Sequence, residues 1–255
     1  MSKGPKRRKY PTDIIIDTVE LMSSSDQTKE KLESNMKNEI IHLASQQDSK
    51  KDFIRQFHEL LRLRRDVRRF KSRQVPENLI QEIISAIELA PSVGLSEPTR
   101  LIRIQTKEIK YDIITNFEME NSRALAGYTG SKAQKYADLK LSGLKEAPVQ
   151  FAVYCDVETE QGFGLGARTI PETKAYSTAC AVMLMWLSAS ARNLGMGWVS
   201  IFNVEEMNQL LQVDPAWKFM GCLCIGWPEE QHLDPELQRY GWQERRPGGA
   251  IVITK

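Results

Sequence analysis

The sequence predicts an α+β or α/β sandwich, in which helices pack on the faces of a central sheet. Helix-period apolar segments alternate along the chain with about four or five strand-like runs. The most apolar of these runs, Val149–Cys155 and Lys218–Trp227, are typical of buried strands. Of the first 50 residues, 14 are hydrophobic (28%), whereas the hydrophobic fraction of the whole chain is 41%. We therefore expect the core of the sandwich to begin near residue 50.

The first half of the predicted domain combines helices with one strand and a polar lid. Phe53, Phe57 and Leu60 recur at helical spacing, which predicts a helix from Asp52. The elements expected after it are a helix opened by Pro76, a break over Ala90–Gly94, a strand over Leu101–Gln105, a short helix over Lys107–Phe117 and a mobile lid over Glu118–Ser131.

The second half alternates helices with buried strands. Pro148 and Gly195 provide helix-stop signals, and no internal repeat of about 20 to 50 residues is visible. The expected elements are a helix over Lys132–Leu144, a strand over Val149–Cys155, a loop over Asp156–Pro171, a helix over Glu172–Asn193, a strand over Trp198–Phe202, a helix over Val204–Leu211, a strand over Lys218–Trp227 and an extended polar tail over Pro228–Lys255.

The chain is expected to have two parts. Residues 1–49 form an extension that is mobile or partly helical, with a helical spacing near Leu32, Met36, Ile40 and Leu43. Its basic start is typical of a solvated terminus, although a targeting address or an RNA-attracting arm has the same composition. Residues 50–255 form the folded domain.

Charge and hydropathy exclude several classes of protein. Thirty-five Lys and Arg against 33 Asp and Glu give a net charge of +2, so we expect no general affinity for polyanions and no nucleic-acid partner. The longest uncharged run, Ala175–Ala191, has 17 residues and is shorter than the ~20 that a bilayer requires. No secretory signal opens the chain. We therefore expect a cytoplasmic protein without a membrane partner.

The cysteines and histidines indicate neither disulfides nor a metal site. Four cysteines are too few for a disulfide scaffold, and we expect all of them to be reduced core residues. The three histidines are widely separated, so we predict no metal ligands. The cysteines are Cys155, Cys180, Cys222 and Cys224, and the histidines are His42, His58 and His232.

A basic segment between Arg62 and Arg73 contains seven cations and one acid, Asp66. Guanidinium groups suit phosphate because their planar forks donate paired, charge-assisted hydrogen bonds. A solvated cationic helix end has the same composition, so the segment alone leaves both interpretations open.

Six motifs, in this order along the chain, resemble those of the nitroreductase-like flavoprotein superfamily. The variant with Asp66, where most members have Ser, resembles the flavin-fragmenting branch of that superfamily. The resemblance covers residues 53–247, and its motifs are Arg64–Phe70 with Ala90–Gly94, Lys140–Val149, Gly164–Gly166, Pro171–Glu172, Tyr176–Ser177 and Gly197–Phe202.

The resemblance implies a central, mainly antiparallel sheet flanked by helices and a domain-exchanged homodimer with FMN at the subunit interface. The implied reaction is the oxygen-dependent fragmentation of reduced FMN to 5,6-dimethylbenzimidazole, the lower ligand of vitamin B12. FMN is then the substrate, and molecular oxygen is the co-substrate. Because no GxGxxG motif follows a strand, we expect the electrons to come from an external flavin reductase.

The resemblance also implies two catalytic residues. Asp66 matches the essential acid of the branch and is expected to act as general acid or base. Its alternative role is an ion pair that only orders the arginines. Ser200 matches a serine near the flavin ring, where its hydroxyl could stabilise developing charge, although a strand-end serine can also simply cap the chain.

The remaining implied site residues bind the flavin. Arg64, Arg65 and Arg68 are assigned to the phosphate and ribityl chain, and Arg245 or Arg246 closes on the phosphate from the tail. Tyr136 and Leu139 are lid contacts that exclude water, although both could be packing residues of their helix. The predicted FMN-binding set is Arg64, Arg65, Asp66, Arg68, Ser92, Glu97, Leu139, Ser200 and Arg246.

Three positions depart from the motifs of this branch. Glu97 replaces a glutamine whose amide can donate a hydrogen bond to the flavin, whereas an ionised carboxylate only accepts. Met183-Leu184 replaces Gln-Asn, and Ser142 replaces Glu. The departures at Glu97 and Met183 leave open an FMN-recycling nitroreductase or quinone-type oxidoreductase. The basic tail and the Arg62–Arg73 cluster leave open a non-catalytic flavin-binding or RNA-contacting protein.

Overall fold

The computed structural model describes residue 37 and residues 48–255. The expected helical spacing of residues 32–43 and most of the predicted extension lie outside these residues. The chain divides into two units at Gln56 and Phe57, and the second unit carries the sheet and the helices from residue 77 onward. A helix spans residues 48–63, as the period from Asp52 predicts. No helix within the described part has the length and hydropathy needed to cross a membrane.

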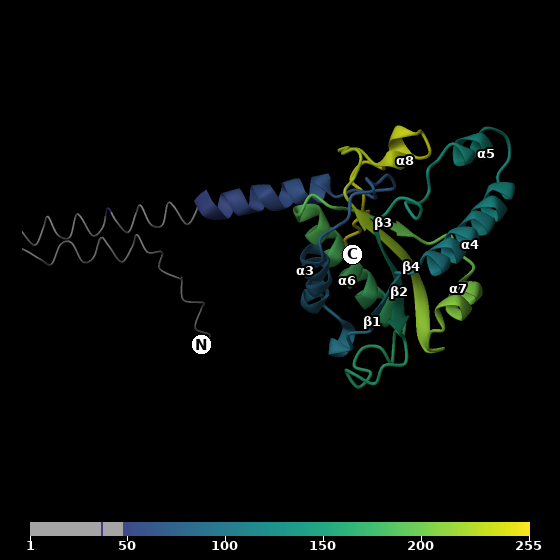
Figure 1. The fold of residues 1–255 in the computed structure, drawn as a ribbon. Coiled ribbons are helices and arrows are strands. Elements are labelled where there is room, and N and C mark those ends of the chain that lie inside the picture. The colour runs from purple at the N-terminus through teal and green to yellow at the C-terminus, as the bar shows by residue number, and fades with distance from the viewer. Residues whose placement is uncertain (1–36, 38–47) are drawn as a thin grey trace, which may run out of the picture. The chain divides into compact units, whose positions relative to one another are not determined.

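Four antiparallel strands form the central sheet (Figure 1). Their order is β1-β2-β4-β3, so β1 and β3 are the edge strands. The alternation of Phe151 and Val153 with Ala152 and Tyr154 along β2 sends side chains to opposite faces. The predicted antiparallel sheet is thus confirmed, and its strands are β1 (Thr99–Arg103), β2 (Val149–Asp156), β3 (Gly195–Val199) and β4 (Trp217–Gly226).

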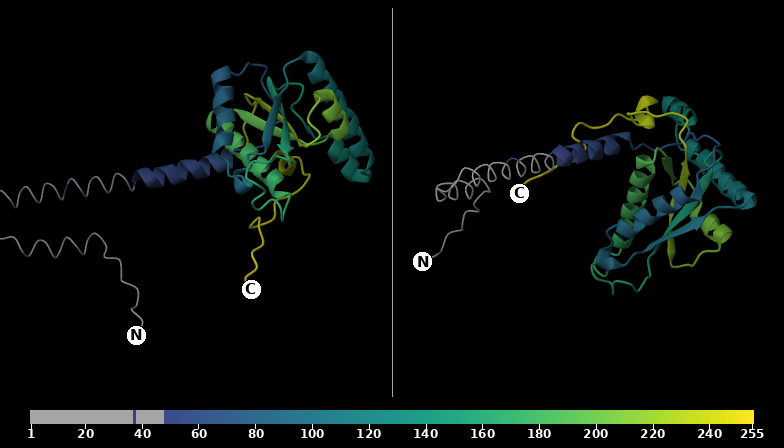
Figure 2. Two further views of the ribbon diagram at one scale, coloured as in Figure 1. Left: turned by 90° about the horizontal axis from the view of Figure 1, so that it is seen from below. Right: turned by 60° about the vertical axis from the view of Figure 1, so that its left-hand side comes forward.

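Helices cover both faces of this sheet (Figures 1 and 2). α3 (Glu77–Ser85) and α6 (Thr173–Ala191) pack on one face, where Ile83 and Met185 contact the Val153 side of the strands. α4 (Lys107–Ala126) and α7 (Val204–Leu211) pack on the other face, around Tyr154. The period-2 pattern of β2 therefore builds two separate cores from one strand.

α4 is longer than expected and occupies most of the predicted lid. The side chain of Thr106 caps its start by accepting a hydrogen bond from the Ile109 N–H. The helix then continues to Ala126, so the prediction of a mobile lid over residues 118–131 is wrong. Glu, Met and Arg in this stretch are good helix formers, and its lack of apolar periodicity reflects the exposed surface of these turns.

α5 (Gly130–Ala137) ends seven residues before the predicted helix end at Leu144. Gly143 explains part of the difference, because a Cβ there would lie 2.3 Å from the Phe70 ring. The chain must approach Phe70 this closely after α5, and a helix carrying side chains on all sides cannot do so. A short helix, α8 (Glu236–Arg239), interrupts the tail that was expected to be extended.

β3 begins and ends three residues earlier than the predicted strand over Trp198–Phe202. Its glycines, which normally weaken a strand, are required here because the neighbouring segment approaches too closely for side chains. The cysteine prediction is confirmed for three residues and is wrong for Cys180, which is exposed on α6. All four cysteines are free.

Candidate active site

The basic segment that follows the helix of residues 48–63 lies along the free edge of β3. Asp66 and Met196 form a parallel bridge, and the Val67 N–H donates to the Met196 carbonyl at 3.1 Å. A Cβ on Gly197 would lie 2.2 Å from the Val67 carbonyl oxygen. The glycines of β3 therefore allow the segment to act as an additional short strand and fix the position of Asp66.

Both carboxylate oxygens of Asp66 accept hydrogen bonds. The Trp198 N–H donates to Oδ1 at 3.1 Å, and Nε of Arg68 donates to Oδ2 at 2.9 Å. The Asp66 side chain is 35% exposed, whereas that of Arg68 is 11% exposed. Asp66 is thus held by two donors and remains accessible to a small molecule.

Arg68 connects this carboxylate to the Lys140 motif. Its Nη1 donates to the Lys140 carbonyl at 2.9 Å, and Nζ of Lys140 pairs with Glu146 at 2.6 Å. Arg68 was predicted to bind FMN, but its guanidinium is turned towards Asp66 and the Lys140 backbone. In this conformation Arg68 orients the carboxylate.

Arg64 and Arg65 form a second cationic group beside Asp66. The guanidinium of Arg64 lies 4.8 Å from the centroid of the Trp186 ring. Burial lowers the pKa of both arginines, and the charge of Arg245 lowers them further, while Asp66 raises that of Arg64. Arg245 therefore lies near them, and the closing of Arg245 or Arg246 on a phosphate stays a prediction. No ion pair within the described residues neutralises Arg64.

Arg65 also fastens the C-terminal segment. Its Nε donates to the Leu233 carbonyl at 2.9 Å, and its Nη1 donates to the Arg64 carbonyl at 2.7 Å. The indole N–H of Trp186 donates to the Arg65 carbonyl at 3.2 Å, and this bond connects the basic segment to α6. Arg65 is accordingly a structural neighbour of the predicted phosphate site.

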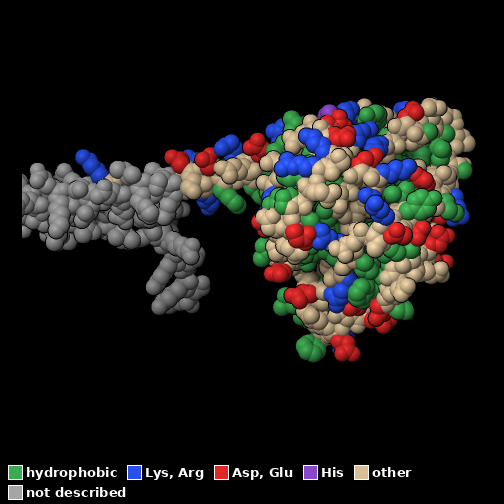
Figure 3. Space-filling view, viewed as in Figure 1, with side chains coloured by type: hydrophobic (Ala, Val, Ile, Leu, Met, Phe, Trp, Pro, Cys, Tyr) green, Lys and Arg blue, Asp and Glu red, His purple; other side chains and the backbone are tan. Residues whose placement is uncertain are grey.

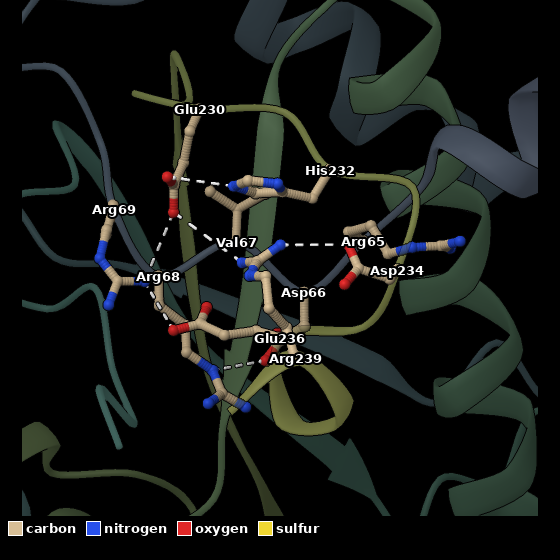
Figure 4. Close-up of a pocket in the computed structure, with 10 residues that line it drawn as sticks. All are labelled: Arg65, Asp66, Val67, Arg68, Arg69, Glu230, His232, Asp234, Glu236 and Arg239. Atoms are coloured by element: carbon tan, nitrogen blue, oxygen red, sulfur yellow. Dashed lines mark hydrogen bonds and ion pairs between the residues drawn. The ribbon is translucent and has the colours of Figure 1, made fainter. Parts of the chain in front are cut away.

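A small pocket of about 30 Å³ lies between the basic segment and residues 230–239 (Figure 4). Nη1 of Arg69 pairs with Glu236 at 2.6 Å, and Glu230 lies between His232 and the guanidiniums of Arg69 and Arg239. Sequence analysis missed these contacts. The signal was available, because an acid-rich stretch near residue 230 complements the arginine-rich run near residue 68.

The other predicted residues differ in their exposure. Ser200 directly follows β3, two residues beyond Trp198, and its hydroxyl has no hydrogen bond to any described residue. Leu139 is half-buried just after α5, and Tyr136 of α5 is buried. Arg246 is exposed in the tail. Asp66 and Ser200 are thus placed on the same edge of the sheet.

Ser92 and Glu97 lie in a different part of the fold. The Val93 N–H donates to Ser177 near the start of α6, whereas Arg65 contacts Trp186 nine residues later, about 13 Å along the helix axis. The hydroxyl of Ser92 accepts from the Glu97 N–H at 3.2 Å. Within one protomer, Ser92 and Glu97 therefore lie apart from Asp66.

The carboxylate of Glu97 is held by an amide. Nε2 of Gln161 donates to Glu97 at 2.8 Å and to the Leu95 carbonyl at 2.9 Å. Glu97 has a positive φ of 41°, and the glycines at 94 and 162 allow the two loops to touch. The departure at residue 97 thus coincides with a glutamine in the facing loop.

Charge on the drawn face and the metal-ligating side chains of the described residues bear on other kinds of site. Basic and acidic side chains are interspersed over the face drawn in Figure 3. Among residues 37 and 48–255, no group of three or more His, Cys, Asp or Glu side chains is placed to hold a metal ion.

The four-stranded sheet between two helical layers, with a basic segment on the β3 edge, defines a known class of flavoprotein fold. The sequence model of the Nitroreductase family matches residues 61–227, which include the sheet and most of the site. The chain belongs to the nitroreductase family.

Within the family, the chain is similar to proteins named 5,6-dimethylbenzimidazole synthase. One from Rhodospirillum rubrum is 45% identical over 188 residues, which cover 74% of this chain and 89% of the relative. Another from Rhodobacter capsulatus is 40% identical over 189 residues, which cover 74% and 91% of the two chains. These relatives bear out the motif-based assignment to the flavin-fragmenting branch.

Solved structures confirm the fold. An iodotyrosine deiodinase bound to FMN and 3-iodo-L-tyrosine superposes with a TM-score of 0.60 at 18% identity, covering 77% of this chain and 97% of that one. A putative nitroreductase from Desulfovibrio desulfuricans in complex with FMN gives a TM-score of 0.50 at 23% identity, covering 77% and 95%. At such identities the likeness concerns the fold alone.

Proposed function

We propose that this protein converts reduced FMN and oxygen to 5,6-dimethylbenzimidazole. The single observation that carries the proposal is the placement of Asp66. Its carboxylate is fixed on the β3 edge by Trp198 and Arg68, and it lies beside the unneutralised guanidinium of Arg64. The relatives at 40–45% identity carry the name of this activity.

The residues at this edge fit a flavin phosphate. Arg245 lies close enough to Arg64 and Arg65 for its charge to lower the pKa of both, beyond the larger effect of burial, an arrangement that a dianionic ligand stabilises. Among the described residues, Arg64 has no carboxylate in ion-pair range, so its charge is available. We assign the phosphate to Arg64 and Arg245, with Arg246 next to them and Arg65 supporting from the Leu233 side.

Bound reduced FMN supplies the electrons for oxygen and the carbon skeleton of the product. Asp66 holds or moves a proton at Oδ2, where Arg68 fixes the carboxylate orientation. Ser200, whose hydroxyl has no hydrogen bond to another described residue, lies further along the same edge and stabilises developing negative charge. Leu139 and Tyr136 cover the site and exclude water.

The proposal includes a homodimer. One face of α6 exposes Tyr176, Cys180 and Met183 at helical spacing, and the tail exposes Ile251 and Ile253. A second copy can cover the α6 stripe, and exchanged tails can extend the partner sheet at its open β1 edge. The second copy then brings its own Ser92 and Glu97 to the site that the first copy leaves incomplete.

The proposal also places the protein in the cytoplasm, where an FMN reductase supplies the reduced flavin. No nicotinamide site is part of the proposal.

A single-turnover experiment tests the proposed function. The purified protein is mixed with chemically reduced FMN without oxygen, and oxygen is then admitted. Permanent loss of the flavin chromophore together with newly formed 5,6-dimethylbenzimidazole, identified by mass, is the expected result. Clean reoxidation to intact FMN would instead favour the recycling type of oxidoreductase.

A further inference from the structure

Three aromatic side chains from distant segments form a cluster, which we call the aromatic clasp: Tyr128, Tyr136 and Trp242. The rings of Tyr128 and Tyr136 are stacked with centroids 4.9 Å apart. Trp242 meets them edge-on, 5.5 Å from Tyr128 and 6.0 Å from Tyr136. Such geometries are the favourable ones for aromatic pairs. The clasp therefore joins the α4–α5 region to the C-terminal segment.

Two lysines of α5 strengthen the same junction. Nζ of Lys132 lies 4.2 Å from the centroid of the Trp242 ring, and Nζ of Lys135 donates to the Gly241 carbonyl at 2.9 Å. Both contacts join α5 to Gly241 and Trp242. Figure 1 shows α5 and α8 at the same end of the fold.

α5 contributes one buried side chain, so the clasp supplies much of its contact with the domain. Tyr136 is its only buried residue among those described, and this ring belongs to neither core of the sandwich. The hydroxyl of Tyr136 donates to Asn121 of α4 at 2.8 Å, and burial raises the pKa of the phenol. Removing the clasp would leave α5 with few contacts to the domain.

The segment that carries Trp242 is anchored at its other end to the basic segment. Arg65 binds the Leu233 carbonyl, Arg69 pairs with Glu236, and the Arg69 guanidinium lies 5.8 Å from the Tyr240 ring. Arg245 follows Trp242 by three residues and lies near Arg64 and Arg65. Trp242 thus stands between α5 and the arginines assigned to the phosphate.

We infer that Trp242 is a positioning residue that couples the closure of α5 to the placement of Arg245, so that the site is covered only when the phosphate is held. The inference rests on the proposed function, in which α5 covers the flavin and Arg245 binds its phosphate. In this inference Trp242 contacts α5 but neither the flavin ring nor its phosphate. Its loss should loosen both elements together.

The first test uses the flavin-free protein and hydrogen exchange. In Trp242→Ala, amides of α5 should exchange about tenfold faster or more, the change that ~1.4 kcal/mol produces, while those of α7 stay unchanged. Trp242→Phe should restore most of the protection because a smaller ring keeps the aromatic contacts. Tyr111→Ala removes an exposed ring of α4 outside the clasp and serves as the control. Unchanged exchange of α5 in Trp242→Ala would overturn the inference.

The second test measures the coupling to the flavin. Trp242→Ala should weaken the binding of oxidised FMN several-fold, which titration of flavin fluorescence measures. With reduced FMN and oxygen, it should raise the fraction of flavin recovered intact, since an open site lets two electrons and two protons pass to oxygen as hydrogen peroxide. Unaltered affinity and unaltered recovery, with faster α5 exchange, would also overturn the coupling.

The wild-type protein separates this inference from the proposed function. If wild type forms no 5,6-dimethylbenzimidazole, the proposed function fails, and the coupling is still decided by α5 exchange and FMN affinity. If the wild-type protein forms the product, and Trp242→Ala recovers the same fraction of intact flavin as wild type, only the coupling fails.

Discussion

The backbone N–H of Trp198 donates a hydrogen bond to Oδ1 of Asp66 at 3.1 Å, although 132 residues separate them in sequence. This bond exists because Gly195 and Gly197 let the basic segment lie directly against the β3 edge. It leaves Oδ2 to Arg68, so the carboxylate has one orientation. The predictions below depend on this placement and on the pairing of two protomers.

Replacing Asp66 by Asn should lower product formation about 10²- to 10⁴-fold, because an amide cannot hold or move the proton in the same way. The affinity for oxidised FMN should stay within about threefold, since the phosphate is held by guanidiniums. Product is measured by chromatography and affinity by flavin fluorescence. Asp112→Asn is the matched control, because this carboxylate is exposed on α4. Product formation at the wild-type rate would remove Asp66 from the chemistry.

Gly197→Ala should destabilise the protein by about 1–3 kcal/mol, the usual cost of overpacking. The new Cβ would lie 2.2 Å from the Val67 carbonyl and push the basic segment away from β3. Urea unfolding gives the loss of stability, and product formation should fall with it. Gly127→Ala, at an α4 end where the Cβ meets only one carbonyl at 3.3 Å, should have little effect. Wild-type stability in Gly197→Ala would contradict the described edge packing.

Glu97→Gln should tighten the binding of reduced FMN about two- to fivefold and leave oxidised FMN unchanged. The reason is that a carboxylate near the anionic reduced ring costs a small, screened repulsion of ~0.4–1 kcal/mol. Anaerobic titrations of both flavin forms measure the difference. Glu88→Gln removes the same charge from an exposed helical turn and should change neither affinity. If Glu97→Gln binds reduced FMN with the same affinity as wild type, residue 97 lies away from the flavin.

Cys180 should report the dimer. If a second copy covers the α6 stripe, labelling of Cys180 by a thiol reagent at about pH 8 will be slow and will accelerate on dilution. The buried thiols give little background, because burial raises the pKa of Cys224 to about 12 and keeps it protonated. Cys180→Ser identifies the reacting thiol. Rapid labelling at every concentration would indicate that the stripe stays open.

Local patterns predicted most of the fold. The runs at residues 149–155 and 218–227 are continuous and apolar, and both are buried strands, because such residues have no other stable location. The helix over Val204–Leu211 has its predicted bounds, with Asn203 as its capping residue. The lid and the helix after it were predicted less well. Glu118–Ala126 is helical without an apolar stripe, and α5 ends where Gly143 must approach Phe70.

The sequence marks the residue types at this edge but not the groups that hold them. Arg64–Arg69 and the single acid Asp66 stand out as a cationic run with one acid, a composition that by itself fits both an anion site and a solvated helix end. The groups that hold Asp66 are a backbone N–H and an arginine, and Arg68 is held by the Lys140 carbonyl. Backbone groups are identical at every residue, so no sequence pattern marks them in advance.

The sequence by itself determined the class of fold and the charged and titratable residue types near Asp66, because hydrophobic period and charge are properties of residue order. The tertiary structure decided which donors face Asp66, where Trp242 meets α5, and that Ser92 and Glu97 lie apart from Asp66 in one protomer. These relationships arise from how distant segments approach one another. They depend on packing between elements, which no local pattern contains.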